Sequence, residues 1–340
     1  MFKYQILIRP LGAMYGSAGG FLSPENLVGR SGAKFPPDAA TLAGLFFSAY
    51  YHNPKVKTEL KENLYVAGPF WAPNSKLNKI CVPIPWTLVM GEEQWDRWEV
   101  KWEKGELTWH RQNSDLDPDY TWQSILDWDD PPGIKKSYQN AQNSLPKNPW
   151  TYSPFLHPQM KKTERSVQQE GGLFLENTVQ VNPDIYLVYL SSYPLEPGWY
   201  RFGGESHLVE IECRDLKGKM KERLQEPIQQ SFALIVPGVW GSNRFSYRSP
   251  YHANCKDFPK PLQMLTDKPI PYRYSAGGQL TRGRYAVPAG SVYILEKPIG
   301  KPWSDWPKKW FPQNGFLKHL GGGLCLPIAV PGLDDSKGVA

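Results

Sequence analysis

The chain has few cysteines and no long apolar run, and both shortages exclude classes of protein. The four cysteines, Cys81, Cys213, Cys255 and Cys325, are far apart in a chain of 340 residues, and none belongs to a CxxC pair. A zinc ribbon or a redox motif is therefore not supported, and we expect free thiols in a reducing cytosol. The N-terminus lacks the apolar region of a signal peptide, and no run is long enough to span a bilayer. We expect a cytoplasmic protein.

The sequence also lacks the common catalytic signatures. No Walker A motif, no GxGxxG after a strand, no HExxH and no GxSxG is present. The six histidines are scattered and no pair has the spacing of metal ligands: His52, His110, His157, His207, His252 and His319. We therefore predict a protein that is not an enzyme and that has no metal site and no cofactor.

Proline, glycine and tryptophan are abundant, and the charge is unevenly distributed. The chain has Pro 33, Gly 30 and Trp 14, which indicates many turns and irregular connections around an aromatic-rich core. Residues 91–130 contain twelve acidic and four basic side chains, a net charge of −8. Because the whole chain carries +6, the remainder carries +14. A polyanionic partner fits the remainder and is not expected to touch residues 91–130.

The order of expected elements predicts an α+β fold made of two ferredoxin-like (RRM-like) halves with long loops and insertions. Residues 2–9 alternate like a half-buried strand, and a helix is expected to begin after Asp38. A second helical stretch is expected at 55–63, and further strands and a helical stretch at 217–230 follow in the second half. We place the first half at 1–150, with the Trp-rich acidic segment as an insertion at about 91–130. The second half is placed at 151–330, followed by a flexible tail at 331–340.

The Trp-rich acidic segment is expected to meet protein. It holds six of the fourteen tryptophans, and we predict a helix over 91–98 and a hairpin over 99–111 that turns at Lys104-Gly105. Carboxylates repel phosphate, whereas tryptophans suit the core of a protein interface. We therefore predict that Trp98, Trp102 and Trp109 contact a protein partner.

Basic residues beside aromatic rings or glycines are candidates for contacts with single-stranded RNA. Cations hold phosphates, rings stack unpaired bases, and glycine-rich backbone lets amide groups approach a phosphate. The glycine pairs and triplets are expected to need small side chains for a close backbone approach. The candidates are Arg30 and Lys34 in a long loop, Lys161, Lys162, Arg165, Arg201, Gly203, Gly204, Arg244, Arg248, Arg282, Arg284, and Gly321, Gly322 and Gly323.

The order and spacing of several short motifs resemble the RAMP superfamily of CRISPR proteins, and within it the third subunit of the Cmr (type III-B) effector complex. Gly321-Gly322-Gly323 is similar to the C-terminal glycine-rich loop of RAMP proteins, and Gly203-Gly204-Glu205 is similar to a central "GGE" element of that subunit. The segments 36–44, 172–174 and 288–293 match further motifs in order. The first loop departs from the pattern, because Tyr15 to Gly20 replaces a Phe-Arg-Asp-Gly type sequence.

The resemblance implies a role in the tag-binding RAMP group, the fifth Cas protein family. Such a subunit binds the repeat-derived 5′ tag of the CRISPR guide RNA and joins the large polymerase-like subunit to the backbone of RAMP subunits. It has no catalytic centre of its own.

Two alternatives remain open. The first is a RAMP endoribonuclease that processes the guide-RNA precursor, for which His52 is the candidate general base. The second is a carbohydrate-binding protein, because tryptophan platforms beside carboxylates suit sugars.

Overall fold

The computed structural model describes residues 1–15, 35–139, 145–158, 161, 163–164, 166–167, 173–253, 255–276 and 279–333. It has more strand than helix, and its strands pair antiparallel, so the predicted α+β class is confirmed. The helices are few: α1 (Ala39–Ala49), α2 (Pro54–Asn63), α3 (Pro131–Tyr138), α4 (Gly218–Arg223) and α5 (Phe316–His319). The predicted helix over 217–230 is thus limited to its first turns, where Gly218 begins α4.

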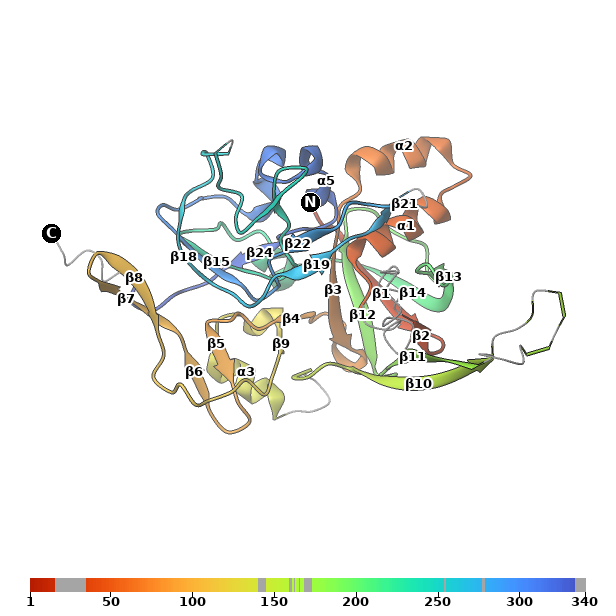
Figure 1. Cartoon of the computed structure of the whole chain (residues 1–340), viewed down its shortest axis with the longest axis horizontal. Coiled ribbons are helices and arrows are strands. Elements are labelled where there is room, and N and C mark those ends of the chain that lie inside the picture. The colour runs from red at the N-terminus through yellow and green to blue at the C-terminus, as the bar shows by residue number, and fades with distance from the viewer. Residues whose placement is uncertain are drawn as a thin grey trace.

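A seven-stranded sheet forms the centre of the first half (Figure 1). Its strands, in spatial order, are β13 (Gly198–Phe202), β14 (His207–Asp215), β1 (Tyr4–Pro10), β12 (Ile185–Ser191), β3 (Val66–Pro73), β4 (Cys81–Pro83) and β9 (Trp122–Ser124). Three of these strands come from beyond residue 150, so the predicted boundary at 150/151 lies within the span of this sheet. The change to the next sheet falls between β14 and β15.

A four-stranded sheet forms the centre of the second half. Its order is β18 (Pro261–Leu265), β23 (Val292–Leu295), β15 (Ser231–Leu234) and β24 (Cys325–Pro327). Counted from β24 to β18 and numbered by their order in the chain, these strands lie fourth, first, third, second across the sheet. The strands β14, β1, β12 and β3 of the larger sheet lie side by side in the same order.

Strand β1 is buried on both faces, because each face packs against a different layer. Ile6 and Ile8 join α1 residues such as Leu42 and Phe46 in one apolar cluster. Leu7 joins the other cluster, together with Phe232 of the four-stranded sheet. The period-two alternation was therefore a correct sign of a strand, but the prediction that it is half-buried is wrong, because the second half covers its other face.

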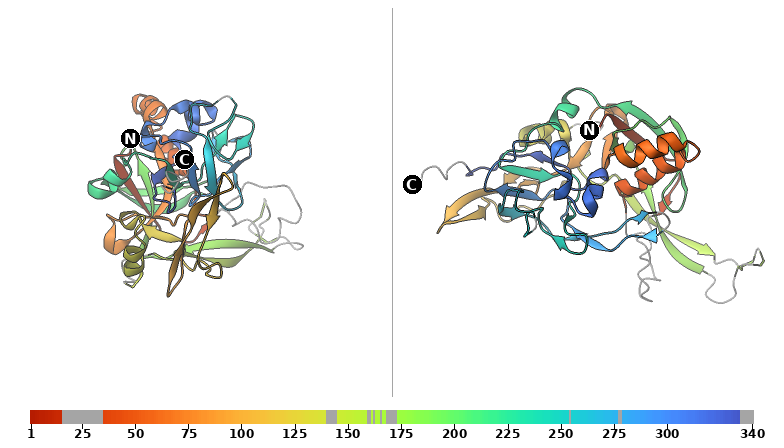
Figure 2. Two further views of the ribbon diagram at one scale, coloured as in Figure 1. Left: turned by 90° about the vertical axis from the view of Figure 1, so that its left-hand side faces the viewer. Right: turned by 90° about the horizontal axis from the view of Figure 1, so that it is seen from above.

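Two hairpins project from the ends of the molecule (Figures 1 and 2). At one end, β10 (Trp150–Pro158) and β11 (Leu173–Val181) form a long ribbon with the short strand β2 (Met14–Tyr15). At the other, β7 (Glu99–Glu103) and β8 (Glu106–His110) form the predicted hairpin, which turns at Lys104-Gly105.

The predicted helix over 91–98 is wrong. Trp95–Arg97 is the strand β6, which pairs with β5 (Leu88–Met90). The acidic segment is also only partly an insertion, since β9 belongs to the seven-stranded sheet and the Trp128 ring is buried in the core. The remaining pairs of strands are β16 (Trp240–Gly241) with β17 (Ser246–Tyr247), β19 (Ile270–Tyr272) with β22 (Arg284–Ala286), and β20 (Ser275–Ala276) with β21 (Gln279–Leu280).

Candidate nucleic-acid interface

Two basic-aromatic segments that are far apart in the sequence lie against one another in the structure. The turn between β16 and β17 carries Arg244 and Phe245, and β22 carries Arg284 and Tyr285. The backbone N–H of Tyr285 donates to the Ser246 hydroxyl at 3.1 Å. The guanidinium of Arg284 donates to the Phe245 carbonyl at 2.8 Å. The fold therefore joins two of the predicted RNA-binding clusters into one surface.

Arg284 is the buried support of this surface and not one of its exposed cations. The side chain is 6% exposed, and its Nη2 donates to the carbonyls of Trp240 and Phe245. Burial, and next the neighbouring charge of Arg282, lower the pKa of this guanidinium. Its Nε and Nη1 have no hydrogen-bond partner among the described residues. The prediction that Arg284 grips RNA directly is thus replaced by a role in holding the β16–β17 turn.

Three aromatic rings and three cations of the joined segments remain available to a ligand. Phe245, Tyr247 and Tyr285 are 57%, 41% and 60% exposed. The exposed cations are those of Arg244, Arg248 and Arg282. The Arg244 guanidinium carbon lies 5.3 Å from the centre of the Phe245 ring, a cation–π contact. Rings flanked by guanidinium groups are suited to stacked bases with phosphates beside them. We call these six residues the basic-aromatic surface.

The Ser242 side chain shapes the turn that presents this surface. Its hydroxyl accepts hydrogen bonds from the backbone N–H groups of Arg244, at 3.2 Å, and Phe245, at 3.0 Å. A serine hydroxyl that binds the amides two and three residues later is a local substitute for a backbone turn. The turn is therefore held from one side by Ser242 and from the other by Arg284.

The glycine pair Gly203-Gly204 forms a hairpin turn at a different place. It joins β13 to β14, and a Cβ on Gly204 would meet nothing within 4 Å. Gly203 has φ +79°, a left-handed backbone conformation that favours glycine. A Cβ added to Gly203 would lie 3.9 Å from its nearest neighbour, a methyl group of Thr41. The prediction of a close approach is therefore not supported by the protein's own packing at either glycine. Arg201 is exposed on β13 nearby.

The triplet Gly321-Gly322-Gly323 does require close approach, but to the protein itself. A Cβ on Gly321 would lie 2.5 Å from the Ala67 Cβ of β3, and one on Gly322 would lie 2.9 Å from the Leu317 carbonyl oxygen. A Cβ on Gly323 would overlap the indole ring of Trp240. Gly321 thus packs against β3 of the first half, whereas Gly322 and Gly323 pack within the second half. The prediction that the triplet faces RNA is not supported at Gly321 and Gly323, which are buried.

Of the predicted cations in residues 30–34 and 161–165, the structure describes only Lys161. Lys161 is exposed beyond the end of β10, and its ammonium lies 3.1 Å from the Glu164 carboxylate. Arg30, Lys34, Lys162 and Arg165 lie outside the described residues.

No protein-family model and no curated protein sequence matches the chain. Solved structures do resemble it. One is the type III-B Cmr-beta complex bound to cognate target RNA and AMPPnP, with 14% identity and a TM-score of 0.49 over 85% of this chain and 86% of that chain. Another is the Csm3-Csm4 subcomplex of the type III-A CRISPR-Cas interference complex, with 10% identity and a TM-score of 0.39 over 88% and 99%. A third is the Csm1-Csm4 cassette in complex with pppApA, with 9% identity and a TM-score of 0.36 over 87% and 88%.

Two of these structures are of type III CRISPR complexes. In the described part of the chain, no helix has the length and apolar character needed to cross a membrane.

The three tryptophans predicted at a protein interface have different environments. Trp102 on β7 is 40% exposed. Trp109 on β8 is partly buried and packs against the apolar core, while Trp98 lies 5.2 Å from the Arg111 guanidinium carbon. Trp95, which was not among the predicted residues, is 41% exposed on β6. The rings free to meet a partner are therefore mainly Trp95 and Trp102.

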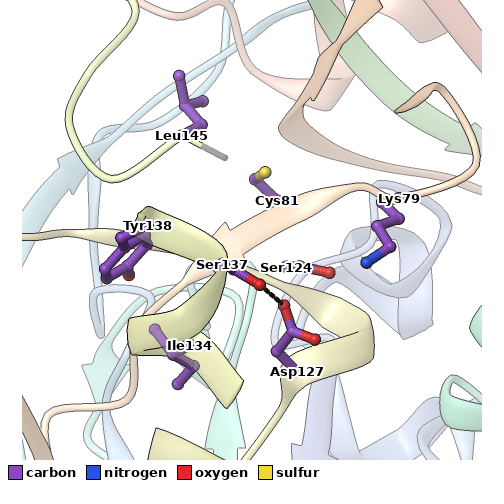
Figure 3. Close-up of a pocket in the computed structure, with 8 residues that line it drawn as sticks. All are labelled: Lys79, Cys81, Ser124, Asp127, Ile134, Ser137, Tyr138 and Leu145. Atoms are coloured by element: carbon purple, nitrogen blue, oxygen red, sulfur yellow. Dashed lines mark hydrogen bonds between the residues drawn. The ribbon is translucent and has the colours of Figure 1, made fainter. Parts of the chain in front are cut away.

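A group of reactive side chains surrounds Cys81, but its geometry does not suit catalysis (Figure 3). The cavity among them has a volume of about 10 Å³, room for a single water. Burial, followed by the charge of Asp127, raises the pKa of the Cys81 thiol to about 12, so it is not a nucleophile at neutral pH. Ser137 donates to Asp127 at 2.6 Å, and Tyr138 donates to the Trp122 carbonyl at 2.6 Å. These contacts are those of a packed core.

A second group contains His52, the candidate general base. The centre of its ring lies 5.2 Å from the centre of the Tyr51 ring. The Lys57 ammonium lies 4.6 Å from the centre of the same Tyr51 ring. Tyr51 and His52 are exposed at the corner between α1 and α2. Sequence spacing alone did not indicate this grouping, in which Lys57 reaches the Tyr51 ring from the first turn of α2.

Proposed function

We propose that this protein is a non-catalytic scaffold subunit of a type III CRISPR effector complex, and that it binds the guide RNA. The observation that carries the proposal is the convergence of two basic-aromatic segments on one surface, held by Arg284. Three exposed rings beside three guanidinium groups have the chemistry for single-stranded RNA. The order of motifs along the chain supports the assignment to a CRISPR complex.

We also propose that the chain consists of two ferredoxin-like halves. The strand order fourth, first, third, second occurs in both sheets, and this order supports a split βαβ origin for each half. The helices are distributed unequally, since α1 and α2 follow β1 in the first half and α5 precedes β24 in the second. Within the complex, the protein would hold the repeat-derived 5′ tag and bridge the large polymerase-like subunit to the RAMP backbone.

The acidic, Trp-bearing face is proposed to contact a neighbouring subunit. Trp95 and Trp102 are each about two-fifths exposed, at 41% and 40%, and the segment around them has excess negative charge. Exposed tryptophan surrounded by carboxylates is suited to a protein partner and unsuited to RNA phosphates. Trp102→Ala should weaken subunit association and leave RNA binding unchanged, and crosslinks from guide RNA to Trp102 would oppose this assignment.

An RNA endonuclease is the second candidate, and the grouping of Tyr51, His52 and Lys57 favours it. His52 and Lys57 each contact the Tyr51 ring. A histidine base and a lysine in one site can cleave RNA without a metal ion, because the base activates the 2′-hydroxyl and the cation stabilises the developing charge. Incubation of the purified protein with repeat RNA, with and without divalent metal, separates the two functions. We expect no cleavage. Specific cleavage that disappears in His52→Ala would establish the endonuclease instead.

The RNA-binding part is tested with a matched set of variants. The triple variant Arg244→Ala, Arg248→Ala, Arg282→Ala should lose affinity for repeat-derived RNA by at least tenfold, about 1.4 kcal/mol. A control that removes three exposed cations elsewhere, at Lys55, Lys61 and Lys219, should keep its affinity. Equal losses in both variants would show only a nonspecific charge effect and would count against the proposed surface.

A further inference from the structure

The hairpin of β13 and β14 is a feature that the proposed RNA surface does not use. Its two strands lie at one edge of the seven-stranded sheet, on the side of the molecule away from the β7–β8 hairpin (Figure 1). Among the described residues, β13 pairs only with β14, so its second edge has no partner strand. An unpaired edge presents a row of backbone N–H and C=O groups to which another chain can add a strand.

One face of the hairpin is anchored in the core, so the edge is a fixed platform. Phe202 of β13 and Val209 of β14 are fully buried, and they belong to the same apolar cluster as Leu42 of α1. The strand β13 contains neither proline nor lysine, and it pairs with β14 in an unbroken register. Proline, lysine and bulges are common means by which an edge strand is kept from pairing with another chain. The backbone of β13 therefore has the regular form that an added strand requires.

The other face of the hairpin exposes apolar side chains side by side. Arg201 on β13 is paired with Leu208 on β14, and the Leu208 carbonyl accepts from the backbone N–H of Leu11 at 3.1 Å. Trp199 lies two positions before Arg201 and therefore on the same face of the strand. Trp199, Leu208 and Leu11 are 72%, 50% and 46% exposed. A tryptophan ring and two leucines exposed together on a sheet face are typical of a surface that meets another protein.

The charges on this face leave one cation without a partner. The Glu210 carboxylate lies 3.4 Å from the Arg9 guanidinium, and the Glu212 carboxylate lies 2.8 Å from that of Arg214. Arg201 is exposed and forms no ion pair with any residue that the structure describes. A carboxylate from another chain would therefore meet the Arg201 guanidinium without displacing an ion pair that is already there.

RNA matches the same face less well than protein does. The two carboxylates, Glu210 and Glu212, would repel phosphates, and leucine side chains offer no ring on which a base can stack. An extended protein segment instead satisfies the open backbone edge, the apolar side chains and the single unmatched cation together. Strand addition to a sheet edge is an established mode of peptide recognition, in which the backbone gives affinity and alternate side chains give specificity.

We propose that an extended segment of a protein partner adds to β13 as a further strand of the seven-stranded sheet. Side chains alternate between the two faces of a strand, and directly opposed side chains have Cβ atoms about 5 Å apart. The segment therefore carries an apolar side chain opposite Trp199 and a carboxylate opposite Arg201, two positions from one another. Arg201, which the sequence predicted to contact RNA, is assigned to this carboxylate instead.

The proposal rests on the proposed scaffold role and gives it a second docking site. The strands that carry Trp95 and Trp102, β6 and β7, lie at the other end of the molecule from β13 (Figure 1). The acidic face around those tryptophans suits a basic partner, whereas the edge of β13 suits an acidic segment. Two sites of different charge at opposite ends allow one chain to join two different subunits.

The first test is a crosslink from the edge strand. The variant Trp199→p-benzoylphenylalanine is introduced into the full chain, and the native complex is purified through a tag on this chain and irradiated. Mass spectrometry should find a crosslink to a protein segment that has an apolar residue and a carboxylate two positions apart. The same photoreactive group in place of Leu262, which is 37% exposed on the edge strand β18 of the other sheet, should not reach that segment.

The second test reverses the charge of Arg201. Arg201→Glu should weaken association with the crosslinked partner by about tenfold or more, whereas Arg201→Lys should retain most of it. Replacement of the partner's carboxylate by lysine should restore association with Arg201→Glu, a rescue that a damaged fold would not show. Because Arg201 is exposed, thermal unfolding should be unchanged, and guide RNA should remain bound.

Four results overturn the strand addition without touching the proposed function. They are an assembled complex with no crosslink from position 199, a crosslink to RNA, a crosslink to a second copy of this chain, and unchanged association in Arg201→Glu. A folded chain that purifies with neither protein nor RNA would instead overturn the proposed function, and the strand addition with it.

Discussion

The buried guanidinium of Arg284 donates to the backbone carbonyl of Phe245 at 2.8 Å, across 39 positions of the chain. Through this hydrogen bond the buried Arg284 positions the turn that carries the exposed Phe245 ring and the exposed Arg244 guanidinium. The distinction between a residue that touches the ligand and one that positions it has measurable consequences.

The salt dependence of RNA binding should separate these two kinds of arginine. Each phosphate contact on single-stranded RNA adds about 0.7 to the slope of log K against log salt. Arg244→Met should lower affinity and reduce the slope by about that amount. Arg284→Met should also lower affinity, because the β16–β17 turn loses its support, yet leave the slope unchanged. Fluorescence anisotropy at several salt concentrations measures both. Equal slopes for the two variants would contradict the assigned roles.

Removal of an exposed aromatic ring should weaken RNA binding by the free energy of stacking one base on that ring. Phe245→Ala and Tyr285→Ala should each reduce affinity by about 1–3 kcal/mol, without a change in salt slope. Trp199 is a suitable control, because it is 72% exposed on the edge strand β13 and belongs to a different surface. If Trp199→Ala weakens RNA binding as much as Tyr285→Ala, the RNA does not lie where we place it.

Two glycine substitutions should differ sharply in their effect on stability. Gly323→Ala places a methyl group into the Trp240 ring at φ +70°, so the free energy of unfolding should fall by about 3 kcal/mol or more. Gly204→Ala meets open space and should change it by less than about 0.5 kcal/mol. Urea unfolding followed by tryptophan fluorescence gives both values. A tolerant Gly323 would show that its packing against Trp240 does not require glycine.

The buried ammonium of Lys318 should make stability depend on pH. It donates to the carbonyls of Ser304, at 2.7 Å, and Trp306, at 2.5 Å, and burial lowers its pKa from 10.5 to about 8. Between pH 8 and 10.5 the unfolded chain therefore binds more protons than the folded one. The free energy of unfolding should rise with pH in this window, by at most about 1.4 kcal/mol per pH unit.

Lys318→Met provides the comparison for this pH dependence. Methionine fits beside the rings of Trp303 and Phe311 that now flank the ammonium. Unfolding of this variant between pH 8 and 9.5 should lack the rise that wild-type protein shows. A rise of the same size in both proteins would assign it to another group.

The sequence predicted those elements whose signals are local. Helix α1 begins directly after Asp38 and α2 begins at Pro54, one residue before the expected start, and the hairpin of β7 and β8 turns at Lys104-Gly105 as expected. The spacing of Trp95, Trp98 and Trp102 favoured a helix over 91–98 incorrectly. Pairing of β6 with β5 overrides that spacing, and a partner strand leaves no trace in the local pattern.

The sequence predicted which residues form the basic-aromatic surface better than it predicted the contacts that hold them in place. Arg244, Arg248 and Arg282 are exposed as expected, whereas Arg284, only two positions from Arg282, turns inward. Arg282 lies before β22, whereas Arg284 is the first residue of the strand, and the pairing of β22 with β19 fixes which strand residues face the core. The glycine triplet was recognised correctly as a site of close approach, but its partner proved to be β3 and Trp240, which are distant in the sequence.

The central claim is that this chain holds guide RNA, and sequencing the RNA that co-purifies with the native protein tests it most directly. We predict RNAs that share one repeat-derived 5′ end, and a loss of these RNAs when Arg244, Arg248 and Arg282 are replaced together by alanine. A preparation that is folded and carries no RNA, or that carries RNAs without a common 5′ end, would contradict it.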